Sequence, residues 1–301
     1  MTTDIAALNA RFGIAGQVVF KQGQGGLDVV EVNNAHSSAS ILLQGAHLMT
    51  WAPKGEKPVI WMSRDAKYVP GKSVRGGVPV CWPWFGPHAK EASFPGHGFA
   101  RTVMWEMIGT KALPEGTWLA FRLVPTEATR AQWPHQSEVV LQMVIGKTLD
   151  MDLATWNTGK KPITIGDALH TYFEVGDVRY AKVHGLHLID YLDKVDGGKK
   201  KQQLGPVIVG SEVDRVYLNT ADTCVIEDTK LARRIRISKQ GSRSTVVWNP
   251  WIEKANKMGD LGPDGYLNMI CVESTNAADD VVTLAPGAEH HLWVRYSVEP
   301  I

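Results

Sequence analysis

The chain has 301 residues, with 32 Lys and Arg against 31 Asp and Glu, so its formal net charge is +1. That balance argues against a broad surface for coating phosphates, so we do not expect a nucleic acid as a partner. No stretch approaches the roughly 18 apolar residues of a spanning helix, and the N-terminus has no basic start followed by an apolar run. With only three cysteines and no C-x-x-C motif, no disulfide framework is expected, and we predict a cytoplasmic protein without a membrane partner.

The first predicted element is a short helix over Asp4–Phe12, with Asp4 as its N-cap and Gly13 as its stop. From there on, runs of strand length and mostly period-two alternation fill the chain, separated by short turns rich in Gly, Pro, Asn and Asp. In chain order the predicted strands are 17–20, 27–33, 40–43, 117–124, 139–145, 149–156, 232–238, 267–273 and 292–298. Lys199–Lys201, after two glycines, is predicted to be a solvated hairpin tip.

These patterns predict an all-β fold, a large antiparallel β-sandwich with few short helices. No strand–helix alternation, repeat or linker interrupts the pattern, so we expect one domain over residues 1–301. The sequence contains no G-x-S-x-G, Walker or H-E-x-x-H motif. The pairs His184/His187 and His290/His291 have no further ligands nearby in sequence, and no metal site is predicted from them.

Two rigid loops carry the first candidate site residues. The segment Ser73–Pro87 holds three prolines, three glycines and three aromatic rings, with Arg75 near its start. An arginine there suits bidentate binding of a phosphate or carboxylate, or a salt bridge to a core carboxylate, and both alternatives stay open. In Phe94–Arg101, His97 lies between two glycines, and Arg101 follows four residues later. The two arginines could converge on one anion; alternatively, the second loop is a tight turn with a structural histidine.

Two apolar strands carry the second pair of candidates. Asp167–Val175 reads as a strand bearing His170, which is suited to acid–base work near neutral pH or is a satisfied core histidine. Leu267–Thr275 is an otherwise apolar run in which Glu273 shares a strand face with Cys271. Apolar surroundings change the proton affinity of a carboxyl group, as a general acid or base requires, although a strand-end glutamate can also simply reach solvent.

In this order, the four segments resemble the aldose 1-epimerase (galactose mutarotase-like) superfamily, and most closely its hexose-6-phosphate mutarotase branch, also called glucose-6-phosphate 1-epimerase. The resemblance runs from about Gly45 to the C-terminus. It rests on the ordered motifs Ser73–Pro79, His97–Arg101, Leu169–Phe173 and Cys271–Glu273, supported by Gly45–His47 with Trp51, Trp248–Trp251 and Pro286–Gly287.

The resemblance implies a β-sandwich enzyme that interconverts the α and β anomers of glucose 6-phosphate or related hexose 6-phosphates, without a metal or organic cofactor. It makes His170 the general acid and Glu273 the general base, expected on opposite sides of a roughly sugar-sized gap. Four further residues are implied to bind substrate: Arg75 and Arg101, with the phosphate as target, Asp214 at a sugar hydroxyl, and His97 near the ring.

Two alternatives remain. The first is an aldose 1-epimerase for unphosphorylated sugars, which gives less reason to place two arginines in rigid loops. The second is a non-catalytic sugar-phosphate-binding protein on the same fold, which we would expect to lack either His170 or Glu273. The sequence also leaves open whether any of four tryptophans near these segments stacks on sugar or packs in the core: Trp82, Trp84, Trp248 and Trp251.

Overall fold

The computed structural model describes residues 4–301 and is built from antiparallel β-sheets. A nine-stranded sheet has the order β16 (Val207–Ile208), β13 (Ala181–His184), β18 (Cys224–Asp228), β19 (Arg233–Gln240), β23 (Glu289–Pro300), β9 (Leu149–Asn157), β8 (Ser137–Gly146), β7 (Gly116–Leu123), β6 (Trp105–Leu113). An eight-stranded sheet has the order β15 (Lys199–Gln202), β14 (Asp190–Asp193), β17 (Val213–Tyr217), β20 (Ser244–Asn249), β21 (Met269–Thr275), β11 (Ala168–Leu169), β5 (Val80–Cys81), with β12 (Tyr172–Glu174) also paired to β21.

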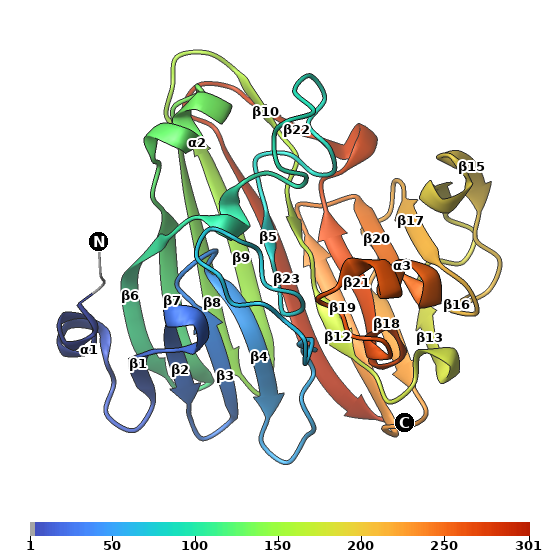
Figure 1. Ribbon diagram of the computed structural model, residues 1–301, viewed down its shortest axis with the longest axis horizontal. Coiled ribbons are helices and arrows are strands. Elements are labelled where there is room, and N and C mark those ends of the chain that lie inside the picture. The colour runs from blue at the N-terminus through green and yellow to red at the C-terminus, as the bar shows by residue number, and fades with distance from the viewer. Residues whose placement is uncertain (1–3) are drawn as a thin grey trace.

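Two smaller sheets complete the fold. One is formed by β1 (Val18–Gln22), β2 (Asp28–Asn33), β3 (Ser37–Leu42) and β4 (His47–Pro53), and the other by β10 (Ile163–Ile165) and β22 (Val282–Leu284). In Figure 1 the β1–β4 sheet lies in front of β6–β9, and β20 and β21 lie to the right. One apolar cluster runs through these layers and includes side chains from all three larger sheets. The predicted antiparallel β-sandwich is therefore confirmed.

Strand β21 shows how alternation divides the molecule into a core side and a second side. Ile270 and Val272 point into the large cluster between the sheets, whereas Met269 and Cys271 belong to a separate cluster with residues of β20 and the loops beyond it. Because successive side chains of a strand point to opposite faces, Glu273 lies on the side of Cys271, away from the main core. The candidate site is built on that second side.

Three α-helices are present among residues 4–301, two more than the sequence predicted. The predicted helix α1 (Ile5–Phe12) is confirmed, and the Asp4 side chain caps it by accepting from the backbone of Ala7. The others, α2 (Glu127–Gln132) and α3 (Trp251–Met258), have only six and eight residues. Such lengths cover about two turns, too few for a 3.6-residue period to identify a helix by itself; α1 is as short as α3, but Asp4 and Gly13 marked its ends in the sequence.

Two sequence predictions about local structure are wrong. Asp167–Val175 is not one strand but two, β11 and β12, because the backbone N–H of Thr171 donates to Leu169 O (2.9 Å) within its own segment instead of continuing the ladder with β21. Lys199–Lys201 is not a hairpin tip but lies in β15; the turn falls on Gly197 and Gly198, whose φ angles of 62° and 78° are left-handed.

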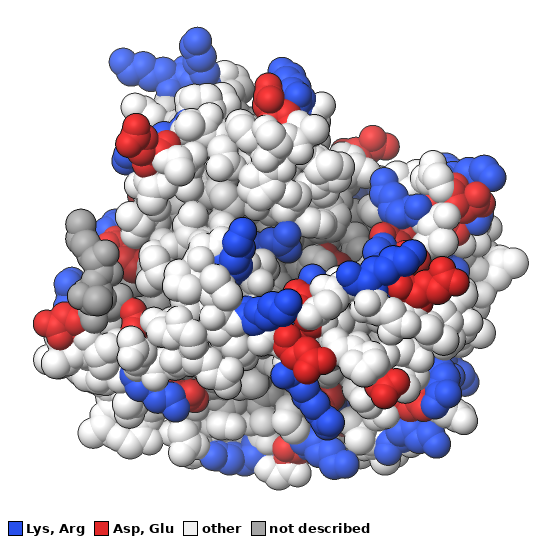
Figure 2. All heavy atoms as spheres, viewed as in Figure 1, with Lys and Arg blue, Asp and Glu red and all other residues white. Residues whose placement is uncertain are grey.

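The surface agrees with the balanced charge. Figure 2 shows basic and acidic side chains interspersed over the face in view, with no patch of one sign covering it. Among residues 4–301, no helix is both long and apolar enough to cross a membrane.

Candidate active site

A cleft of about 550 Å³ opens over the second side of the eight-stranded sheet. All six residues predicted for the site line it: Arg75, His97, Arg101, His170, Asp214 and Glu273. They come from loops and strands up to 198 residues apart in sequence (273 − 75). Tertiary structure therefore brings the whole predicted set to one hollow.

The two proposed acid–base groups are in direct contact. His170 Nε2 lies 3.4 Å from Glu273 Oε1, and the side chains are only 12% and 1% exposed. The expected sugar-sized gap between them is therefore wrong. Two adjacent groups of this kind can exchange protons with two oxygens that are bonded to the same carbon.

Burial disfavours charge on both members of this pair. The pKa of His170 is held well below its ordinary value by burial, and by the nearby His97 and Arg101. Burial raises the pKa of Glu273 well above its ordinary value; Asp214 adds to that shift, while Arg101 opposes it. Neither His170 Nδ1 nor Glu273 Oε2 has a hydrogen-bond partner among the described residues. We therefore regard the two side chains as a unit that shares one proton across their contact.

The two arginines differ in their partners. Arg75 pairs with Asp260 (Nε–Oδ1 3.1 Å) and donates to the Tyr172 hydroxyl (2.9 Å). Burial opposes its charge, but Tyr172 and Asp260 outweigh burial and raise the pKa of Arg75. Arg101 instead donates to the backbone oxygen of Gly96 (2.9 Å), and no carboxylate in residues 4–301 lies within ion-pair distance of it. Arg75 thus has the carboxylate partner that one of the two sequence interpretations expected, and it also lines the cleft, whereas Arg101 is a cation available to an anion.

His97 is held in a strained turn beside His170. Its φ of 65° is left-handed, which costs a residue with a side chain energy. Two contacts with Gly86 fix it: the His97 N–H donates to Gly86 O (2.7 Å), and Gly86 N–H donates to His97 Nδ1 (3.2 Å). Its ring centre lies 5.8 Å from that of His170, and burial lowers the pKa of His97 to about 3. His97 is thus a neutral turn histidine whose ring faces the cleft.

Asp214 of β17 also lines the cleft and lies beside a lysine that the sequence did not suggest. Lys254 Nζ is 2.8 Å from Glu212 Oε1 and 3.7 Å from Asp214 Oδ2, and it lies 6.0 Å from the ring centre of Trp248. Lys254 belongs to α3, the helix that sequence patterning missed, so no signal pointed to it. The other lining residues that lie outside the predicted segments are Lys194, Val216, Val246 and Met258.

Of the four tryptophans near the motifs, one lines the cleft. Trp248 lines this cleft, whereas Trp82 is 1% exposed and lines a different hollow of about 590 Å³. Trp84 and Trp251 are not among the residues that line the cleft. Of the four, Trp248 is therefore the tryptophan available to a sugar face in this cleft, in the neighbourhood of Asp214 and Lys254.

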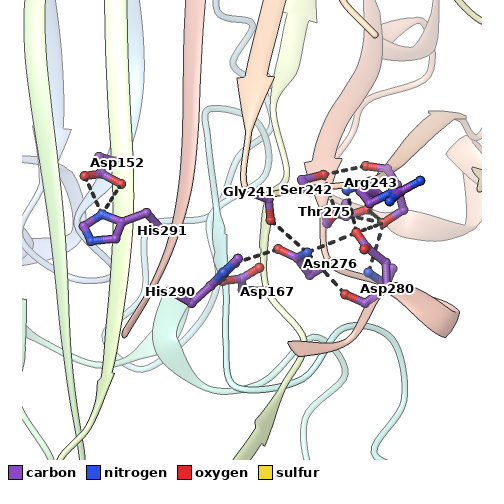
Figure 3. A network of polar contacts seen from close by, with 12 residues as sticks. Asp152, Asp167, Gly241, Ser242, Arg243, Thr275, Asn276, Asp280, His290 and His291 are labelled. Carbon is purple, nitrogen blue, oxygen red and sulfur yellow. Dashed lines mark hydrogen bonds and ion pairs between the residues drawn. The ribbon is translucent and has the colours of Figure 1, made fainter. Parts of the chain in front are cut away.

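A polar network connects the ends of the strands that carry the pair (Figure 3). The Asn276 N–H donates to Asp167 O (2.8 Å), which ties the end of β21 to the start of β11. His290 Nε2 lies 3.0 Å from Asn276 Oδ1, and His291 Nδ1 lies 2.9 Å from Asp152 Oδ2. These two histidines thus take separate polar partners, Asn276 just after β21 and Asp152 on β9, and do not converge on one site.

Asp167 is the unusual member of this network. It is completely buried, neither carboxyl oxygen has a hydrogen-bond partner among the described residues, and His290 Nε2 lies 3.9 Å from Oδ2. Burial, reinforced by the charge of Asp280, raises the pKa of Asp167 to about 8. Asp167 therefore carries a proton at neutral pH.

The antiparallel sandwich that carries this cleft is a galactose mutarotase-like fold. A Lactobacillus casei galactose mutarotase-like structure superposes with a TM-score of 0.71, covering 90% of this chain and 100% of that one; at 15% identity it supports the fold alone. The sequence profile of aldose 1-epimerase matches residues 28–297, and the chain belongs to this family.

Its relatives include proteins named for one activity. An Escherichia coli K12 protein named "Putative glucose-6-phosphate 1-epimerase" is 40% identical over 254 residues, 84% of each chain. A protein of the same name from Cenchrus ciliaris is 34% identical over 286 residues, 91% of this chain and 86% of that one. A Salmonella typhimurium crystal structure titled as a "putative mutarotase (YeaD)" has a TM-score of 0.89 at 35% identity, covering 95% of this chain and 94% of that one.

Proposed function

We propose that this protein is a hexose-6-phosphate mutarotase that interconverts the α and β anomers of glucose 6-phosphate or a related hexose 6-phosphate. The observation that carries the proposal is the buried His170–Glu273 contact in the same cleft as Arg101, a cation with no carboxylate partner in the described chain. The names of the relatives point to the same reaction.

In this mechanism, Glu273 takes the proton of the anomeric hydroxyl while His170 gives a proton to the ring oxygen, and the C1–ring oxygen bond breaks. Rotation about the C1–C2 bond presents the other face of the carbonyl, and the reverse transfers close the ring to the other anomer. The pair holds one shared proton before and after each half-reaction, so no proton must come from solvent. Proton transfer by positioned groups contributes typically ~10²–10⁴-fold to such a rate.

Arg101 gives the phosphate a role beyond binding. Its positive charge disfavours the protonated form of His170. A phosphate dianion at Arg101 would offset that charge, making the imidazolium easier to form at the time when it must act as acid. Asp214 and the Trp248 face would hold the sugar, so that binding far from C1 positions the reacting oxygens.

The test is NMR exchange spectroscopy between the α and β signals of glucose 6-phosphate, with and without the protein, and with plain glucose as the parallel substrate. We expect exchange of glucose 6-phosphate to be accelerated much more than exchange of glucose. Equal acceleration of both would favour an aldose 1-epimerase for unphosphorylated sugars. Binding of glucose 6-phosphate without any acceleration would favour a non-catalytic sugar-phosphate-binding protein.

A further inference from the structure

A third potential metal ligand lies beside the His170–Glu273 pair. Donor atoms of His170, Cys271 and Glu273 all lie within 4.8 Å of one another, and all three residues are buried. Cys271 and Glu273 reach the same side because they are two positions apart on β21, and His170 comes from the break between β11 and β12. In residues 4–301, this is the one group of three such side chains close enough to hold an ion. The proposed acid–base reaction makes no use of the thiol.

The spacing fits a tetrahedral zinc ion. Zinc–nitrogen and zinc–oxygen bonds of about 2.0–2.2 Å at a tetrahedral angle place the two donor atoms about 3.4 Å apart. The His170 Nε2–Glu273 Oε1 distance is 3.4 Å. A zinc–thiolate bond of about 2.3 Å places sulfur about 3.6 Å from each of the other donors, so Cys271 needs to approach by roughly an ångström at most.

The charges and the open side of the site also fit. A divalent ion bound by the Cys271 thiolate, the Glu273 carboxylate and a neutral imidazole forms a neutral unit, which a buried site tolerates far better than a single charge. Glu273 Oε2 has no hydrogen-bond partner among the described residues, so the carboxyl group is not held in its present contact by a second bond. Because His170 and Glu273 line the cleft, an ion can enter there, and water can occupy the fourth position.

We propose that His170, Cys271 and Glu273 form an inhibitory binding site for a thiophilic divalent cation, with zinc as the preferred ion. On binding, the thiol proton and the proton shared by the pair leave to solvent, and three bonds to the metal form. Since the metal then occupies the lone pairs that would exchange protons with the sugar, it competes with substrate instead of assisting the reaction. The inhibition rests on the proposed function, whereas binding of the ion does not, and the ion is an inhibitor and not a cofactor of the reaction.

The test is titration of the full-length protein with cobalt(II), whose thiolate-to-metal charge-transfer absorption reports a bound sulfur directly. We expect one equivalent to produce that band together with the intense visible bands of a four-coordinate ion, and zinc to displace both. Cys271→Ser should abolish the charge-transfer band and weaken zinc binding by calorimetry at least about tenfold, since even outer-shell changes at metal sites cost that much. Cys224→Ser is the matched control, because Cys224 is also a buried free cysteine but lies on β18 of the other large sheet, and it should keep the band.

Absence of the band in the wild type, its persistence in Cys271→Ser, or its loss in a folded Cys224→Ser would each overturn the proposal. Cys271→Ala and a thermal unfolding curve of each variant separate loss of a ligand from loss of the fold. Zinc should also slow anomer exchange in the wild type, and Cys271→Ser should need at least about ten times more zinc for the same inhibition. The cobalt spectrum does not depend on the proposed mutarotase activity, so failure of that activity and failure of the metal site are distinguishable.

Discussion

Replacing Arg101 with alanine tests the proposed phosphate contact most directly. Arg101 makes no ion pair in the described chain and gives only one hydrogen bond, to the backbone of Gly96, so its removal leaves no buried carboxylate without a partner. A hydrogen bond to a charged group is worth about 1.5–3 kcal/mol, which corresponds to a loss of roughly 10- to 150-fold in kcat/KM for glucose 6-phosphate. The same change should have little effect on any exchange of plain glucose, which has no phosphate.

The assay is the NMR exchange rate as a function of substrate concentration, for both sugars and for the variants Arg101→Ala and Arg101→Lys. Lysine keeps the charge but not the bidentate geometry, so we expect an intermediate loss. Arg75→Ala is the contrasting variant, since it also strips Asp260 of its partner and should lower the melting temperature as well. Equal losses for phosphorylated and free sugar in Arg101→Ala would refute the reasoning, because they would make this arginine a structural group.

Three further changes test the acid–base pair and the framework behind it. Glu273→Gln should abolish anomer exchange while the unfolding curve stays close to the wild type, because an amide cannot accept the proton; retained exchange would remove Glu273 from the mechanism. Asp167→Asn should become more stable relative to the wild type as pH rises from about 4 to 8. Burial raises the pKa of Asp167 in the folded protein to about 8, so over this range the native state keeps a proton that the unfolded state has released. The free energy of unfolding of the wild type therefore falls by at most about 1.4 kcal/mol per pH unit. A pH-independent difference in denaturant titrations of the two proteins would contradict that assignment. Gly98→Ala should lower the free energy of unfolding by more than the roughly 1–2 kcal/mol of a left-handed alanine, since its Cβ would lie 1.9 Å from Trp82 O. Gly197→Ala, with φ of 62° and open space around it, should cost only that amount. Equal free energies of unfolding for the two variants would show that the loop bearing His97 can shift to accommodate the methyl group.

Local patterning predicted part of the sheet framework, because side-chain alternation on a half-buried strand can be recognised in the sequence. It missed other strands, among them β4, β6, β17 and β20. The predicted strands 117–124 and 149–156 correspond closely to β7 (Gly116–Leu123) and β9 (Leu149–Asn157). The same alternation correctly put Cys271 and Glu273 on one face of β21. Patterning failed where a backbone hydrogen bond leaves the ladder: the Thr171 N–H donates to Leu169 O, and a strand predicted as continuous breaks there.

The sequence also contained every chemical group of the proposed site, in an ordered set of motifs specific enough to indicate a family. It could not place those groups in space, because contacts between residues 103 positions apart, such as His170 and Glu273 (273 − 170), depend on strand pairing and packing that local patterns do not encode. Only the tertiary structure decided three points: the pair is in contact instead of spanning a sugar-wide gap, Arg75 already has a carboxylate partner while Arg101 does not, and Lys254 of α3 stands beside Asp214. The formal net charge of +1 describes the chain as a whole. The charges that a ligand would meet depend instead on the burial of a few groups in one cleft.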